Sequence, residues 1–116
     1  MGMDVMGVDP VSERGAYFRR NIWGWHPLWT AVANIAPDIA QNVPLAHSND
    51  GDGLDGEDSR RLADRLDEAL NNGEADSYVR VVRAQCRANG LPEVLNLDDL
   101  REFRDFLREC GGFRIL

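Results

Sequence analysis

Hydrophobic residues recur at helical spacing through the second half of the chain. Leu62, Leu66 and Leu70 lie four positions apart, which places them on one face of a helix. The same periodicity predicts three helices, over residues 58–72, 75–89 and 97–109. Gly73 and Gly90 should end the first two helices, because glycine readily adopts the left-handed conformation found at helix ends.

The first half is less regular and contains an aromatic segment, "YFRRNIWGWHPLWTAVANIA" (17–36), that holds all three Trp residues. Pro27 predicts the start of a fourth helix, because proline fits the first helical position. Pro37 should end that helix, since proline cannot continue it. The connection that follows, 37–57, is long for a compact domain, and loops of this length are often functional.

Short apolar runs at both ends of the chain predict strands. Val5 and Val8 lie near the start, and Phe113 and Ile115 alternate with other residues near the end. Pairing the two runs gives a two-stranded ribbon, which needs helices packed against it to be stable. We therefore predict one domain, residues 1–116, of mostly α (α+β) class, with about four helices and a short ribbon that joins the termini.

The negative charge is concentrated in one segment. The chain has a formal net charge of -7, and its 13 basic residues are all Arg. Residues 50–76 contain ten acidic residues and three Arg, so this segment carries the whole net charge. Such polarity would steer a basic protein partner toward one face. It argues against direct binding to nucleic acid, whose phosphates require cationic side chains.

The stretch "NDGDGLDGEDS" (49–59) opens this acidic segment and admits three interpretations. A calcium loop with Gly53 at position 6 would put Ser48 and Ser59 at positions 1 and 12, which need Asp and Glu, so that match fails. Glycine also shapes turns, and Asp55 or Asp58 can cap the next helix. The third interpretation is an acidic recognition surface.

The aromatic segment has two interpretations. Its Trp residues could form the core of a small domain. Alternatively, Trp23 and Trp25 could line a binding groove with Arg19 and His26 at its rim, because aromatic residues dominate interface energetics.

Groups suited to catalysis or metal binding are sparse. Cys86 and Cys110 fall on predicted core faces, where a thiol is usually inert. His26 and His47 could act as bases, but the sequence identifies no third group to orient either one. None of these four residues has a close ligand partner along the chain, so we predict no metal and no cofactor. The sequence leaves enzymatic activity open and favours a binding role.

The sequence shows no sign of export or of a membrane anchor. The first ten residues lack the basic and apolar regions of a signal peptide. No apolar run is long enough to cross a bilayer, so we predict no membrane partner. Two cysteines do not make a disulfide framework. We therefore expect a cytoplasmic protein with free thiols, whose oligomeric state the sequence does not indicate.

The stretches "GAYFRRNIWGWHPLW" and "NDGDGLDGEDSRRLADRL" together resemble a group of small uncharacterised proteins found in bacteria and their phages. The matching residues are Gly15, Tyr17, Phe18, Arg19, Asn21, Trp23, Trp25, Pro27, Leu28 and Trp29, then Asn49, Asp50, Gly51, Gly53 and Leu54. His26 stands where the group has Arg, which weakens any inference about charge there. The resemblance implies that the two stretches form one unit, and it brings no activity with it.

Two functions from different classes follow. The leading prediction is a non-catalytic protein-binding module whose acidic loop-helix face meets a basic partner. A specific version is a phage-type inhibitor that presents carboxylates, as phosphate mimics, to a basic or nucleic-acid-binding host protein. The alternative is a small-ligand or divalent-metal site, with catalysis left open, between the Trp-rich segment and the Asp/Gly loop. The predicted binding residues are Asp50, Asp52, Asp55, Glu57, Asp58, Trp23, Trp25, Arg19 and His26.

Overall fold

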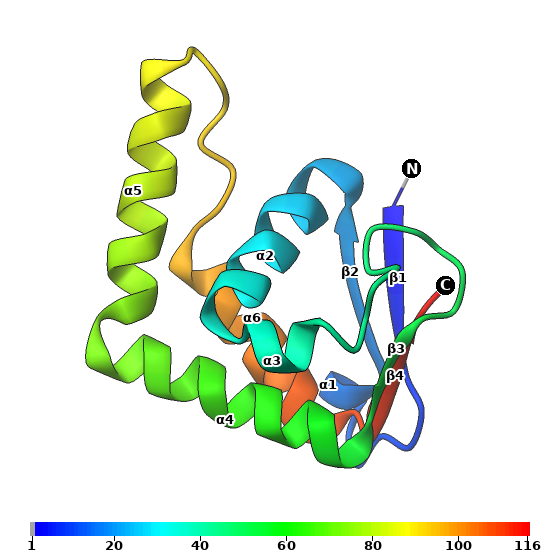
Figure 1. The fold of residues 1–116 in the computed structure, drawn as a ribbon. Coiled ribbons are helices and arrows are strands. Elements are labelled where there is room, and N and C mark those ends of the chain that lie inside the picture. Colours follow the sequence, from blue (N-terminus) through cyan, green and yellow to red (C-terminus); the bar gives the residue numbers. More distant parts are fainter. Residues whose placement is uncertain (1) are drawn as a thin grey trace.

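The computed structural model describes residues 2–116, which form six helices and a four-stranded sheet (Figure 1). The elements follow in the order β1 (Gly2–Gly7), α1 (Glu13–Ala16), β2 (Tyr17–Asn21), α2 (Ile22–Ile35), α3 (Pro37–Ala40), β3 (Gly53–Asp55), α4 (Gly56–Asn72), α5 (Glu74–Ala88), α6 (Leu97–Glu109) and β4 (Gly112–Ile115). Helices α1 and α3 have four residues each, so the four longer helices make up most of the helical structure.

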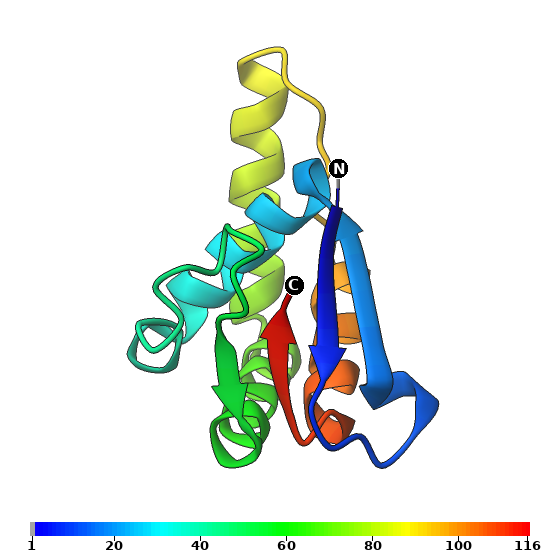
Figure 2. The same cartoon turned by 90° about the vertical axis from the view of Figure 1, so that its right-hand side faces the viewer.

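The four strands form one antiparallel sheet in the order β2-β1-β4-β3. Strands β1 and β4 come from opposite ends of the chain and lie side by side at its centre, with Val5 opposite Ile115. Helices α2, α4 and α6 lie on one side of the sheet, and the face turned to the viewer in Figure 2 is left uncovered. Residues along β1 follow this division, because Met3 and Val5 are buried whereas Met6 is exposed.

The predicted pairing of the termini is confirmed, but the predicted ribbon is the centre of a larger sheet. Strand β2 lies inside the aromatic segment, where adjacent Arg19 and Arg20 hide any simple alternation. Strand β3 has three residues, too few for a period of two to be recognised. Strand β3 forms by pairing with a distant segment, whereas β2 pairs with the preceding strand β1 across a connection that contains α1.

The four predicted helices are present, and one of them begins earlier than predicted. Helix α2 starts at Ile22 rather than at Pro27. The Asn21 side chain accepts a hydrogen bond from the Gly24 amide at 2.9 Å, which satisfies the first turn. Pro27 therefore lies inside the helix and removes one backbone hydrogen bond. Complete burial of Trp25 on the same helix helps to offset that cost.

The ends of the other helices follow the sequence signals. Asn96 caps α6, and the Asp99 side chain completes a capping box by accepting from the Asn96 amide. Gly73 separates α4 from α5 with a φ of 88°, which is the left-handed conformation expected at a helix end.

Aromatic rings connect the helices to the sheet. The ring of Phe103 on α6 lies 5.7 Å from that of Trp25 on α2 and 6.3 Å from that of Phe113 on β4. All three side chains are completely buried, within one continuous hydrophobic core. None of the helices in residues 2–116 is long and apolar enough to cross a membrane.

Helix α5 and the segment that follows it project from the body (Figure 1). Only Ala75 and Val79 are buried on this helix. The Arg83 guanidinium donates hydrogen bonds to the backbone oxygens of Glu93 and Leu95, at 2.9 and 2.8 Å. These two bonds tie the returning segment to the middle of the helix.

The position of β4 at the centre of the sheet predicts a large effect of its inward side chains on stability. Phe113→Ala should lower the free energy of unfolding by about 3–5 kcal/mol, because it leaves a cavity between β4 and α6. Leu116→Ala is the control, since Leu116 is 55% exposed and should change stability by less than about 0.5 kcal/mol. Urea unfolding followed by circular dichroism measures both, and equal effects of the two changes would contradict the central role of β4.

Candidate functional site

The acidic loop residues lie along the outer edge of the sheet. Strand β3 is an edge strand, and the chain enters it from the Asp/Gly loop and leaves it directly into α4 (Figure 2). Asp50 and Asp52 precede the strand, Asp55 ends it and Glu57 begins the helix. We call these four residues the acidic edge.

The glycines of the loop have structural causes. A Cβ atom on Gly53 would lie 1.8 Å from the Phe113 carbonyl oxygen, so only glycine allows β3 to approach β4 here. Gly51 has a φ of 88°, a conformation that side chains other than glycine rarely adopt. The glycine content therefore follows from strand pairing and needs no calcium ion to explain it.

Two carboxylates of the acidic edge also hold the backbone in place. The Asp52 carboxylate accepts hydrogen bonds from the amides of Leu45 and Gly53, both at 2.9 Å. Asp55 accepts from the Asp58 amide at 2.8 Å and so caps α4, as the sequence predicted. The other two, Asp50 and Glu57, are exposed, and the only protein partner of either carboxylate in residues 2–116 is the Ser48 hydroxyl on Asp50.

Arginines from outside the acidic segment neutralise its far half. Asp67 accepts from Arg104 at 3.0 Å and lies 3.2 Å from Arg108, both on α6. Asp76 pairs with Arg80 at 2.9 Å on α5. Of the predicted site residues, Asp58 is also paired, with Arg61 at 2.8 Å.

The carboxylates left without an ion pair gather near the acidic edge. In residues 2–116, no Arg lies within 4.0 Å of Asp9, Glu13, Asp50, Asp52, Asp55, Glu57 or Asp64. Arg60 and Arg114 are the arginines without an ion pair in the same part of the chain. The carboxylates without an ion pair thus occupy a shorter segment than the sequence indicated, because most of them lie between residues 50 and 64.

The tryptophans divide between core and surface. Trp25 and Trp29 are buried, at 0% and 4% exposure, whereas Trp23 is 77% exposed. The Trp25 indole donates a hydrogen bond to the backbone oxygen of Ala46 at 2.8 Å, inside the protein. Trp25 therefore packs in the core and ties the long loop to α2, and Trp23 alone presents an aromatic surface.

Arg19 lies away from the acidic edge, on the uncovered face of the sheet. It pairs with Asp4 at 3.0 Å, and the Tyr17 hydroxyl donates to the same carboxylate. The Tyr17 hydrogen bond, with Arg19 adding to it, holds the pKa of Asp4 below its usual value. The same hydrogen bond raises the pKa of Tyr17. Strands β2 and β3 form opposite edges of the sheet, so Arg19 does not join the predicted acidic surface.

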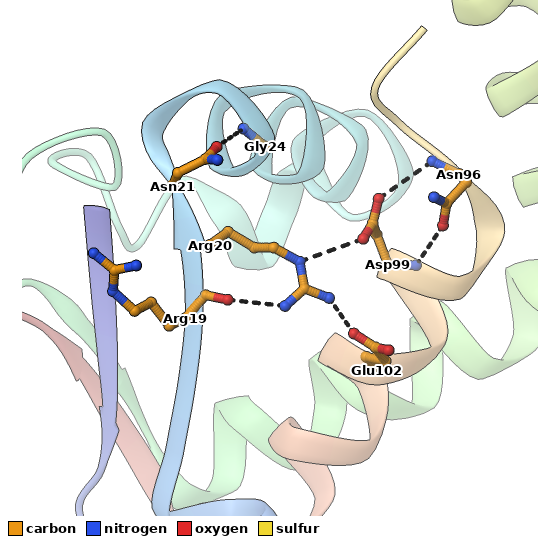
Figure 3. A network of polar contacts seen from close by, with 7 residues as sticks. All are labelled: Arg19, Arg20, Asn21, Gly24, Asn96, Asp99 and Glu102. Atoms are coloured by element: carbon orange, nitrogen blue, oxygen red, sulfur yellow. Dashed lines mark hydrogen bonds and ion pairs between the residues drawn. The ribbon is translucent and has the colours of Figure 1, made fainter. Parts of the chain in front are cut away.

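Arg20, the next residue, clamps the end of β2 to the start of α6 (Figure 3). Its guanidinium donates to Asp99 at 3.3 Å, to Glu102, and to the backbone oxygen of Arg19 at 2.8 Å. It also lies 4.5 Å from the ring centre of Phe18, where a cation is attracted to the aromatic face. The side chain is 24% exposed, which makes this the most protected arginine of the aromatic segment. Its role is structural.

The structure brings together two histidines that the sequence keeps 21 residues apart. His26 lies on α2 and His47 on the long loop, and their ring centroids are 4.3 Å apart. Partial burial, with repulsion from His26 added to it, lowers the pKa of His47 from its ordinary value of 6.5. The sequence prediction missed this pair, because no spacing rule connects a helix to an irregular loop. No group of three or more His, Cys, Asp or Glu residues in the described chain is placed to hold a metal ion.

The surface hollows do not coincide with the predicted small-ligand site. One hollow of about 370 Å³ is lined by Asp38, Ile39, Arg61, Asp64, Arg65 and Glu68. Another of about 300 Å³ is lined by Arg14, Tyr17, Phe18, Glu102, Asp105 and Phe106. Neither lies between the aromatic segment and the Asp/Gly loop. Five of the six residues that line the first hollow and three of the six that line the second are charged, unlike the apolar lining that small-molecule sites usually have.

Comparisons of the chain with protein-family models, with curated proteins and with solved structures found no match. The resemblance to small bacterial and phage proteins therefore stays a prediction from the two stretches that carry it.

The protected position of Arg20 predicts a measurable contribution to stability. Arg20→Met should lower the free energy of unfolding by about 1–2 kcal/mol, because it leaves Asp99 without its charged partner and removes the contact with Phe18. Arg101→Met is the matched control, since Arg101 forms an exposed pair with Asp98 and should cost less than about 0.5 kcal/mol. Chemical denaturation of the two variants compares them directly. A cost for Arg20→Met no larger than that of the control would show that the clamp is unimportant.

The histidine pair predicts a pH dependence with a defined sign. Because the folded-state pKa of His47 is lowered, its stabilising contribution is complete above pH 6.5 and is lost as pH falls through the folded-state pKa. Between pH 7.5 and 5.5, His47→Gln should therefore lose less unfolding free energy than the unmodified protein. An NMR titration of the ring gives the pKa itself, which should rise toward 6.5 in His26→Gln. A His47 pKa unchanged by His26→Gln would exclude coupling between the rings.

Proposed function

We propose that the protein is a non-catalytic binding module that uses the acidic edge to bind a basic protein partner. The observation that carries this proposal is the group of carboxylates without an ion pair where the chain passes through β3 into α4, while most other carboxylates of the acidic segment pair with arginines. An uncompensated acidic surface attracts cationic partners and accelerates their association.

The edge supplies both fixed and adaptable carboxylates. Asp52 and Asp55 are held by backbone amides, so their charges have defined positions. Asp50 and Glu57 lie at the two ends of the edge and are free to adjust to a partner. Preorganised charge lowers the entropy cost of binding, because fewer side chains must be immobilised.

A narrower version of the proposal makes the partner a nucleic-acid-binding protein. The carboxylates of the acidic edge follow one another along the loop, β3 and the start of α4, and a succession of negative charges is also what a nucleic acid backbone presents to a basic groove. Under this version the protein acts as a phage-type inhibitor of a basic or nucleic-acid-binding host protein. The complex would then be weakened by salt and displaced by duplex DNA.

A matched pair of double variants tests the role of the acidic edge. Asp50→Asn with Glu57→Gln removes two charges from the edge without touching the carboxylates that hold the backbone. Glu13→Gln with Asp98→Asn removes two charges at exposed positions on other elements and leaves the same net charge. Proteins captured from a bacterial lysate by the unmodified chain should be lost from the first variant, retained by the second and released as salt increases.

Equal capture by the two double variants would show that net charge alone, or a different surface, accounts for binding. Circular dichroism of both variants must match that of the unmodified protein, so that any loss of capture reports the surface and not the fold. If duplex DNA does not displace the captured proteins, the narrower version is excluded and the basic-partner proposal stays in place.

A further inference from the structure

We propose that His26 and His47 form an open binding site for a divalent transition-metal ion, with the two imidazoles as its protein ligands. The two rings belong to different elements, α2 and the loop between α3 and β3, and they are the only histidines of the chain. Their centroids are 4.3 Å apart, with the ring planes inclined by 51°. The proposal does not depend on the function proposed for the acidic edge, although Asp52 of that edge holds the Leu45 amide two residues before His47.

The position of the two rings is fixed by a neighbouring buried hydrogen bond. The Trp25 indole donates to the backbone oxygen of Ala46 at 2.8 Å, and these two residues directly precede His26 and His47. Trp25 is completely buried and Ala46 is 2% exposed, so the backbone at both histidines is anchored in the core. Ligands held on an anchored backbone are preorganised, which is what a binding site requires.

The ring nitrogens have no partner that would explain the pairing. In residues 2–116, neither imidazole takes part in a hydrogen bond between side chains or with the backbone, and neither lies within 4.0 Å of a carboxylate oxygen. Both residues are exposed, so an ion can reach them from solvent. Two titratable rings held together without a carboxylate between them repel when both are protonated, and a shared metal ion would remove that conflict.

Imidazole nitrogen is a good ligand for Zn²⁺, Ni²⁺ and Cu²⁺. Zn–N bonds are about 2.0–2.1 Å long, so two nitrogens on one tetrahedral ion lie about 3.3 Å apart. The ring centroids, now 4.3 Å apart, would have to separate to about 5 Å so that one nitrogen of each ring points at a shared tetrahedral ion. No third His, Cys, Asp or Glu in the described residues is placed to complete a metal cluster, so water would fill the remaining positions. The site is therefore of the open, exchangeable kind.

Isothermal titration of the full, untagged chain with NiCl2 and with ZnCl2 at pH 7.5 tests the proposal. The unmodified protein should bind one ion, and His26→Gln and His47→Gln should each weaken binding at least about tenfold, since even outer-shell changes cost that much. Two variants serve as controls that keep both histidines. Cys86→Ser removes the more accessible thiol, and Asp50→Asn removes a carboxylate of the acidic edge, and both should bind as the unmodified protein does.

An NMR measurement on the unmodified protein makes the test independent of the variants' folding. Zn²⁺ should shift the ring ¹⁵N resonances of His26 and His47 together, and the midpoint of unfolding should rise because the ion binds only the folded arrangement. Lowering the pH to 5.5 should abolish binding, since protons compete for the same nitrogens. The proposal is overturned if there is no one-to-one binding, if either His→Gln variant retains full affinity, or if only one ring shifts.

Discussion

The fold depends on the pairing of its first and last strands at the centre of one sheet. Strand β1 also pairs with β2, and β4 also pairs with β3. Each edge strand therefore has a partner only when its central strand is in place. The contact joins residues that are 110 positions apart, Val5 and Ile115, and such non-local pairings are slow to form. Helix α6 packs its phenylalanines onto the inner face of this pair and thereby links the late part of the chain to its beginning.

The acidic edge shows how a fold redistributes charge that the sequence only counts. The segment from 50 to 76 carries the whole net charge, yet α6 returns across it and places Arg104 and Arg108 against Asp67. What stays without an ion pair is the part that borders the edge of the sheet, although Arg60 and Arg114 lie beside it. An exposed strand edge is also a place where proteins risk unwanted pairing, and charged side chains there discourage it. The same carboxylates can therefore prevent unwanted pairing at the edge strand and also recognise a basic partner.

The sequence predicts those parts of the structure that repeat locally. Leucine spacing identifies α4 and capping chemistry identifies Asp55 and Gly73, because helix formation is governed by residues within a turn or two. It does not predict β3 or the histidine pair, since each depends on which distant segment lies alongside, and it misses β2 because that strand has no clear alternation. The aromatic segment illustrates the limit of sequence-based prediction. Trp23 and Trp25 are two residues apart in sequence, and which face of α2 packs against the core decides that one is exposed and the other buried.

The projecting α5 has a consequence for how the protein would unfold. Its last turns, beyond Val82, contain no buried side chain, and the two hydrogen bonds from Arg83 fasten only the returning segment. Such a region can open locally without disturbing the core, because little apolar surface is lost. All three tryptophans lie on α2, so fluorescence would report α2 and its surroundings, whereas the helical signal in circular dichroism would include α5. Fraying of the projecting end of α5 would then make the unfolding transitions seen by fluorescence and by circular dichroism differ, even for a central sheet that melts in a single step.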